Sequence, residues 1–271
     1  MVFNTPERIA QLTPDNPFGR LPDGRPEISE DLLRRARLVS PEEAWSVLER
    51  RHGYKFQFTG DWHVLHPDRV LVGRAVTAAF MPMRPDLDRV VLEWGAAKGW
   101  SHRQNTWVID NLIQDDVVVV DMFGKVRDGT FAGDNLATAI KTRTGTGMVV
   151  DGGIRDARQI AELDDFNCFV RGIDPSAIAD VTLVGVNIPV RIGNAMVLPG
   201  DLVLGTSAGV TFIPPSLVEE IVIHSEETRL RDEFGKQRLT EGAYSSAQID
   251  TMTWEPEIQA DYLRWKDRRG V

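Results

Sequence analysis

Apolar residues recur along the chain with two different spacings, which predict a protein that contains both buried strands and amphipathic helices. Residues 69–81 (RVLVGRAVTAAFM) and 117–121 (VVVVD) are apolar runs rich in β-branched side chains, which predict strands. Residues 28–51, 86–100 and 215–239 carry apolar positions at helical spacing. Because a strand that is apolar throughout needs cover on both faces, we expect a sheet enclosed between other layers.

Short strands and turns dominate the second half of the chain. Residues 181–213 contain apolar runs separated by turn signals such as Gly193-Asn194 and Pro199-Gly200-Asp201. These turns leave no room for crossover helices, so we expect mostly antiparallel pairing in this region. Strand–helix alternation before it and strand–turn–strand order within it together predict an α/β fold with a mixed sheet.

The two ends of the chain differ from its middle. Residues 1–27 hold five prolines and several turn dipeptides, which predict an N-terminal arm instead of a packed element, better suited to an oligomer contact than to catalysis. Residues 28–240 form the predicted catalytic domain, and residues 241–271 form a polar C-terminal tail. We expect the aromatic residues of this tail to dock on another surface; they are Tyr244, Trp254, Tyr262 and Trp265.

Composition narrows the classes of partner. The 271 residues carry a formal net charge of −9, which argues against a surface for nucleic acid or for an anionic membrane. The one cysteine, Cys168, lies in the apolar context FNCFV and is expected in the core. The sequence shows no leader-like start and no apolar run near the roughly 20 residues that span a bilayer. We therefore expect a cytoplasmic protein.

Residues 129–156 hold the densest group of glycines and charges. A predicted helix at 136–144 follows Gly133-Asp134, and a short buried strand is expected at 148–150. Unpaired amide groups at a helix start can bind a carboxylate, so Gly133 to Leu136 form a candidate anion cradle. The alternative is an ordinary helix start capped by Asp134 or Asn135.

Arg155 and Asp156 follow the strand at 148–150 and two glycines. This is the position at which α/β proteins place ligands, beyond the carboxyl end of a parallel strand. Arginine offers a planar fork for a carboxylate or an enolate oxygen, and aspartate offers a hard oxygen for Mg²⁺. A surface ion pair of little energetic value is the alternative.

The two pairs together resemble the signature of a known group. Gly133-Asp134, twenty residues, and then Arg155-Asp156 are similar to the class II pyruvate aldolases that cleave 4-hydroxy-4-methyl-2-oxoglutarate and to the related RraA-like proteins. The stretches VGRAVTA at 72–78 and IPVRIGNAMVLPGDLVLGTSAGVTFIP at 188–214 carry the same resemblance. It covers about residues 38 to 240.

The resemblance implies a fold, an assembly and an activity. The fold would be a β/β/α swivelling-type sandwich, in homotrimers or homohexamers with the active site at the subunit interface. The activity would be divalent-metal-dependent cleavage of a 4-hydroxy-2-oxo acid through a pyruvate enolate. Oxaloacetate decarboxylation would be a side activity, because it passes through the same enolate.

The resemblance also implies residue roles. Asp156 would bind Mg²⁺ or Mn²⁺, Arg155 would contact the ketone oxygen and stabilise the enolate, and Asp134 would help position a metal-bound water. The backbone of the loop that starts at Gly133 would hold the substrate carboxylate. The candidate site residues are thus Gly133, Asp134, Asn135, Leu136, Arg155 and Asp156.

Three departures leave the distal half of the substrate open. Gln159 stands where the aldolase pattern has an acid, and Ser46 stands where relatives carry aspartate. An acid from a partner's C-terminal helix is also expected, for which Asp232 or Glu233 is a candidate. The alternative function is that of a non-catalytic RraA-like regulator of a ribonuclease, against which the retained Arg-Asp pair argues. No glycine motif for S-adenosylmethionine follows a first strand, so a methyltransferase is rejected.

Other residues carry weaker signals. His63 and His66 have the closest approach to metal-ligand spacing, and a structural role is the favoured interpretation. We expect the tryptophans of the central region to belong to the core or to an interface; they are Trp94, Trp100 and Trp107.

Overall fold

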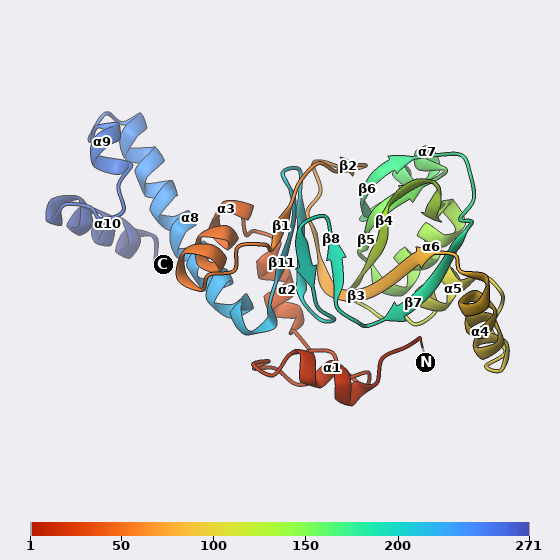
Figure 1. The fold of residues 1–271 in the computed structure, drawn as a ribbon. Coiled ribbons are helices and arrows are strands. Elements are labelled where there is room, and N and C mark those ends of the chain that lie inside the picture. The colour runs from red at the N-terminus through yellow and green to blue at the C-terminus, as the bar shows by residue number, and fades with distance from the viewer. Residues whose placement is uncertain (1, 271) are drawn as a thin grey trace.

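A nine-stranded mixed sheet organises the protein, whose computed structural model describes residues 2–270 (Figure 1). The strand order is β1-β11-β10-β3-β4-β5-β6-β2, and β7 also pairs with β3. Strands β3 to β6 run parallel, whereas β7, β10 and β11 pair antiparallel. The α/β class, the mixed sheet and the antiparallel second half are thereby confirmed. The strands are β1 (Phe58–Thr59), β2 (His63–Val64), β3 (Leu71–Pro82), β4 (Asp116–Ala132), β5 (Gly147–Ile154), β6 (Asn167–Ile173), β7 (Val181–Val186), β8 (Val190–Ile192), β9 (Ala195–Val197), β10 (Leu202–Thr206) and β11 (Gly209–Ile213).

The central strands form the middle of three layers and are covered on both faces, as the apolar runs predict. One apolar cluster joins a face of β3 to β6 to the helices α4 to α7, and Val118 and Val150 belong to it. The other face, with Val117 and Val149, packs on β8 to β11. This is the β/β/α sandwich that the resemblance implies. The helices of the α layer are α4 (Pro85–Ala96), α5 (Gln104–Ile109), α6 (Asp134–Thr144) and α7 (Ala157–Ala161).

A second helical group covers the other end of the sheet. Helices α2 and α3 and the π-helical turn η1 pack with α8 on β3, β10 and β11. Ser40 begins α3 with a reciprocal capping box to Glu43, as its Ser-Pro-Glu-Glu sequence predicts. The elements of this group are α2 (Glu30–Ala36), α3 (Pro41–Trp45), η1 (Ser46–Arg51), the short η2 (Pro215–Leu217) and α8 (Val218–Thr240).

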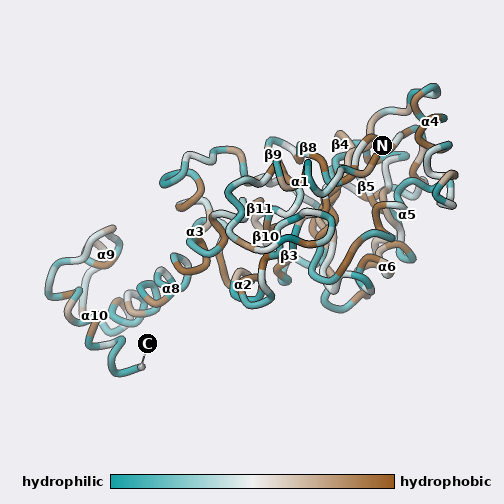
Figure 2. The backbone as a smooth tube through the Cα atoms, turned by 90° about the horizontal axis from the view of Figure 1, so that it is seen from below, coloured by the Kyte–Doolittle hydropathy of each residue, from teal (hydrophilic) through white to brown (hydrophobic). Residues whose placement is uncertain are grey.

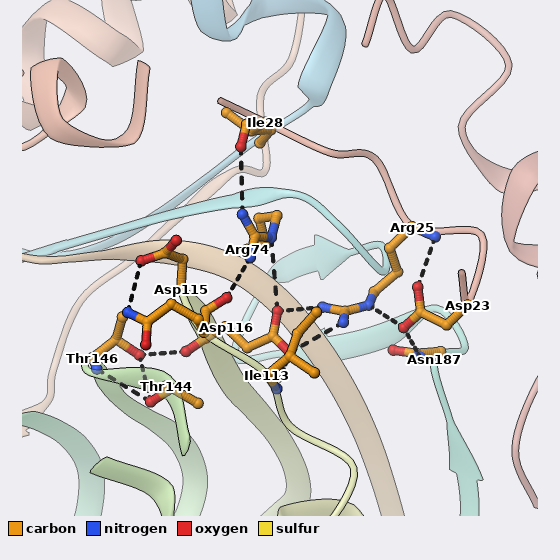
Figure 3. Close-up of polar contacts among 11 residues, drawn as sticks. Asp23, Arg25, Ile28, Arg74, Ile113, Asp115, Asp116, Thr144, Thr146 and Asn187 are labelled. Carbon is orange, nitrogen blue, oxygen red and sulfur yellow. Dashed lines mark hydrogen bonds and ion pairs between the residues drawn. The ribbon is translucent and has the colours of Figure 1, made fainter. Parts of the chain in front are cut away.

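The N-terminal segment is packed, in contrast to the loose arm that its prolines predict. It contains the helix α1 (Pro6–Leu12), and Val2, Ile9 and Arg25 are buried. Arg25 makes two hydrogen bonds, of 2.7 and 3.1 Å, to the fully buried carboxylate of Asp116 (Figure 3). A buried arginine–carboxylate pair holds the segment against the start of β4.

The aromatics of the C-terminal tail dock on a surface outside the tail, and that surface is α8 of the same chain. Helices α9 (Ser246–Ile249) and α10 (Pro256–Arg269) fold back on the second half of α8 and enclose Phe234. Figures 1 and 2 show that this helical unit projects away from the sheet. The residues around Phe234 are Leu230, Tyr244, Ile249, Trp254, Ile258, Tyr262 and Trp265.

Two smaller expectations also have clear outcomes. Cys168 is fully buried in β6, and burial raises the pKa of its thiol above the usual range, so it is a core residue. The three central tryptophans pack on one another, and two of them, Trp94 and Trp100, also pack on Phe3, with ring centroids 5.4 to 6.2 Å apart. Within residues 2–270, no helix combines the length and the apolar character that a bilayer crossing requires.

Candidate active site

The sheet brings the two halves of the candidate site together. Strand β4 continues beyond the predicted run through an irregular excursion, with positive φ at Phe123 and Asp128, before it rejoins β5. Ala132 is then paired with Ile154, and the Arg155 amide donates to the Ala132 carbonyl at 3.1 Å. As a result, the loop that starts α6 and the loop that leaves β5 lie side by side, although twenty residues separate their charged pairs in the sequence.

Four residues of these loops lie in close contact. The Asp156 carboxylate accepts a hydrogen bond from the Asp134 amide at 3.4 Å and lies 3.5 Å from Nε of Arg155. A Cβ atom on Gly133 would come within 2.4 Å of the same carboxylate oxygen. The close approach of the Asp156 carboxylate therefore requires glycine at position 133.

The backbone of the loop already presents donors to carboxylate oxygens. The amide of Asp134 donates to Asp156, and the amide of Asn135 donates to the side chain of Asp134 at 2.7 Å. Gly133 is the N-cap of α6 and has no side chain of its own to cap the first turn, so the acceptors come from Asp134 and Asp156. The loop thus favours anionic oxygens through two of its amides, in line with the partial positive charge at a helix start.

Asp156 adopts a left-handed backbone conformation, with φ of 56° and ψ of 34°. Aspartate tolerates this conformation better than most residues do, because its short side chain bonds locally. The conformation turns the chain sharply between β5 and α7. Both Arg155 and Asp156 keep side chains that are about two-fifths exposed, at 45% and 39%.

A pocket of about 510 Å³ opens beside the two loops, a volume suited to a small molecule. Gly133, Leu136 and Arg155 line it, whereas Asp134, Asn135 and Asp156 are not among its lining residues. The remaining wall comes from β3, α4, α5, the end of β4 and the segment before β7. These lining residues are Phe80, Met83, Asp88, Leu92, His102, Arg103, Gln104, Asn105, Thr130, Phe131, Ala177, Ile178, Ala179, Asp180 and Val181.

The sequence patterns missed the ionisable residues of that wall. Arg103 and His102 add to Arg155 as cationic or titratable groups, and Asp88 and Asp180 are the acids. They lie in segments that carry no recognisable motif, so only the folded chain shows that they share a pocket.

Asp156 offers an exposed carboxylate for a metal at this place, and the partly exposed Asp134 lies beside it. Within residues 2–270, no group of three or more His, Cys, Asp or Glu side chains is arranged to hold a metal ion. Mg²⁺ commonly uses only one or two protein carboxylates and keeps several waters. The Asp156 side chain, held against Gly133 and open to solvent, fits that mode of binding.

The residues at which the sequence departs from the aldolase pattern are not part of the pocket wall. Gln159 is exposed on α7, and Ser46 begins η1, which packs with α8. Glu233 pairs with Arg269 of the same chain at 2.6 Å. The contribution of Asp232 or Glu233 to a partner's site stays a prediction.

The fold defines a β/β/α protein, and a pocket lies beside the ends of its parallel strands β4 and β5. The chain belongs to the RraA-like family, described as Aldolase/RraA, whose model matches residues 42–212. This confirms the resemblance seen in the sequence.

Similar proteins include one that is named as an aldolase and one that belongs to a family of ribonuclease inhibitors. A protein of Halalkalibacterium halodurans, named as a candidate 4-hydroxy-4-methyl-2-oxoglutarate aldolase, is 32% identical over 126 residues. The match covers 46% of this chain and only 59% of that relative. The crystal structure of Streptomyces coelicolor RraAS2, an unusual member of the RNase ES inhibitor RraA family, superposes with a TM-score of 0.66 at 28% identity. That superposition covers 82% of this chain and all of the other.

A third likeness supports the fold alone. An uncharacterized protein of Pseudomonas syringae pv. tomato superposes with a TM-score of 0.67 at 19% identity, over 86% of this chain and 97% of the other.

Proposed function

We propose that this protein is a divalent-metal-dependent lyase that cleaves a 4-hydroxy-2-oxo acid to pyruvate and a second carbonyl compound. The observation that carries the proposal is the contact of Gly133, Arg155 and Asp156 beside a pocket of small-molecule size. The similarity to a protein named as a candidate aldolase supports it. Decarboxylation of oxaloacetate is the proposed side activity, because it needs the same enolate.

The chain's own residues account for binding and charge stabilisation. The loop amides of Gly133 to Leu136 hold the substrate carboxylate, and the Arg155 fork donates to the 2-oxo oxygen. The C4 hydroxyl loses its proton to solvent, and its oxygen forms a carbonyl with C4 as the C3–C4 bond breaks. The electron pair of the broken bond moves into the enolate, which then takes a proton from solvent at C3 to give pyruvate. Arg155 acts where negative charge develops on the enolate oxygen, the position at which a fixed donor lowers the barrier most.

Asp156 would hold Mg²⁺ or Mn²⁺, which polarises the 2-oxo group as a Lewis acid when bound. The role of Asp134 is to orient the cradle, since its carboxylate binds the amide of Asn135. The proposed assembly is a homotrimer or homohexamer with the site completed at the subunit interface.

Pyruvate release from a panel of 4-hydroxy-2-oxo acids and from oxaloacetate tests the proposal. We expect release with Mg²⁺, loss of release with EDTA, and loss in Asp156→Asn. The matched control is Asp61→Asn, because Asp61 has a similar φ of 60° in the loop between β1 and β2. Release that persists with EDTA, or in Asp156→Asn, would contradict metal-dependent cleavage at this site.

A second candidate function follows from the likeness to RraAS2, a member of an RNase ES inhibitor family. In that case the chain binds a ribonuclease and performs no chemistry. Its test is the affinity for RNase ES with and without EDTA. Tight binding that is unchanged by metal removal, together with no pyruvate release, would favour this candidate over the lyase.

A further inference from the structure

Among the described residues of the pocket wall, Arg103 is the one arginine besides Arg155. The proposed reaction assigns no role to Arg103. It directly precedes α5 and is exposed. Within residues 2–270, its hydrogen bonds are those of its backbone: its amide donates to Ser101, and its carbonyl accepts from Thr106. No described acid lies in ion-pair contact with its guanidinium, in contrast to Arg25 and Arg171, which are paired inside the protein.

The backbone of Arg103 is nevertheless fixed relative to the loop at Gly133. The buried side chain of Asn105 donates to the Phe131 carbonyl at 2.8 Å, two residues before Gly133. The buried side chain of Gln104 donates to Asp88 at 2.9 Å and accepts from the Leu183 amide. The guanidinium is therefore a free group on a rigid support, which limits the entropy that a ligand contact would cost.

The acids of the pocket leave this guanidinium available. Asp88 uses one carboxylate oxygen for both Gln104 and the hydroxyl of Thr182, at 2.9 and 2.7 Å. Asp180 directly precedes β7 and forms no ion pair with Arg103 in the described chain. An unpaired arginine in a recess is suited to a carboxylate, which it binds through two parallel hydrogen bonds.

The geometry points to Arg103 as a specificity-determining residue that binds a second carboxylate, on the part of the substrate beyond C3. This inference rests on the proposed function, because Arg155 and the loop at Gly133 are taken to hold the pyruvyl half. The pocket would then select oxo acids with an anionic distal group over neutral chains of equal length.

Binding of two probes separates this role from catalysis. 2-Oxoglutarate carries a distal carboxylate and 2-oxopentanoate lacks it, while both have the same 2-oxo acid end. With Mg²⁺ present, calorimetry should give tighter binding of 2-oxoglutarate to the wild type. Arg103→Gln should weaken that binding about 10- to 100-fold, the loss expected for a charge-assisted hydrogen bond, and should change 2-oxopentanoate less than threefold.

Two further variants control the measurement. Arg103→Lys keeps the charge without the planar fork and should retain part of the preference. Arg89→Gln removes an arginine of α4 that pairs with Glu93 on the surface, and it should bind both probes as the wild type does.

The outcomes distinguish this inference from the proposed function. Equal affinity of the wild type for both probes, or equal weakening of both in Arg103→Gln, overturns the role of Arg103. An Arg103-dependent preference in a protein that releases no pyruvate from any substrate would leave the role standing and refute the lyase.

Discussion

A methyl group at position 133 tests the contact on which the candidate site depends. Gly133 has φ of −108° and ψ of −168°, an extended conformation that alanine also adopts, so Gly133→Ala adds no backbone strain. Its Cβ would lie 2.4 Å from the Asp156 carboxylate and 3.0 Å from Nε of Arg155. Since unstrained heavy-atom contacts are about 3.5 Å, the carboxylate must move by about 1 Å.

The expected effect on activity is large and the effect on stability is small. A displacement of about 1 Å in a reacting group costs about 100-fold in rate. Alanine is a poorer N-cap than glycine, which lowers the free energy of unfolding by about 1 kcal/mol. A typical domain has about 5–15 kcal/mol of stability, so the variant remains folded.

The assay combines Mn²⁺ affinity, measured by electron paramagnetic resonance, with the rate of Mg²⁺-dependent oxaloacetate decarboxylation. Both should fall in Gly133→Ala while the melting temperature changes by only a few degrees. Gly60→Ala is the matched control, because its Cβ would meet no atom closer than 3.9 Å. Wild-type metal affinity and rate in Gly133→Ala would refute the reasoning.

Three further predictions can be tested by urea unfolding. Asp156→Ala should lower the free energy of unfolding by about 1 kcal/mol more than Asp156→Asn, because asparagine tolerates the left-handed conformation; equal stabilities would contradict this. Arg25→Met leaves the buried Asp116 carboxylate without its hydrogen-bonded partner, with only the more distant Arg74 at 3.8 Å as a cation, and should cost about 3–5 kcal/mol, part of which Asp116→Asn should restore in the double variant. Burial raises the pKa of the Asp201 carboxyl to about 7, against a hydrogen bond from the Leu198 amide. Between pH 4 and 7 the native state therefore holds a proton that the unfolded state has lost. The free energy of unfolding should decline as pH rises through this window, and this group contributes up to about 4 kcal/mol to the decline. Asp201→Asn should remove that decline, and an unchanged slope would contradict the burial argument.

The local pattern of apolar residues was sufficient to predict the strand β3 and the helix α6 beside the candidate site. The run at 69–81 corresponds to β3 (Leu71–Pro82), and the helix expected at 136–144 corresponds to α6 (Asp134–Thr144). These segments are covered by other layers, so their periodicity reports their burial directly. The glycines at 152 and 153, expected in a loop, instead belong to β5, because the excursion of β4 returns to pair with them.

Contacts between segments that are far apart in the sequence could not be predicted from such local patterns. Arg103 and Asp88 share a pocket with Arg155 only because α4 and α5 pack beside the ends of β4 and β5. Arg25 lies in a proline-rich segment, and its partner Asp116 is 91 residues away. Tyr262 and Trp265 have helical spacing in α10, but the sequence did not specify α8 as the surface that they cover.

The most direct test of the central claim is exchange of the pyruvate methyl protons with D₂O, followed by proton NMR. Exchange requires formation of the pyruvate enolate and needs no knowledge of the distal half of the substrate. We predict exchange in the wild type with Mg²⁺, none with EDTA, and a rate reduced about 100-fold or more in Arg155→Gln, with Arg158→Gln as the nearby exposed control. Absence of exchange in the metal-loaded wild type, or an unchanged rate in Arg155→Gln, would contradict a pyruvate-enolate site formed by the loops at Gly133 and Asp156.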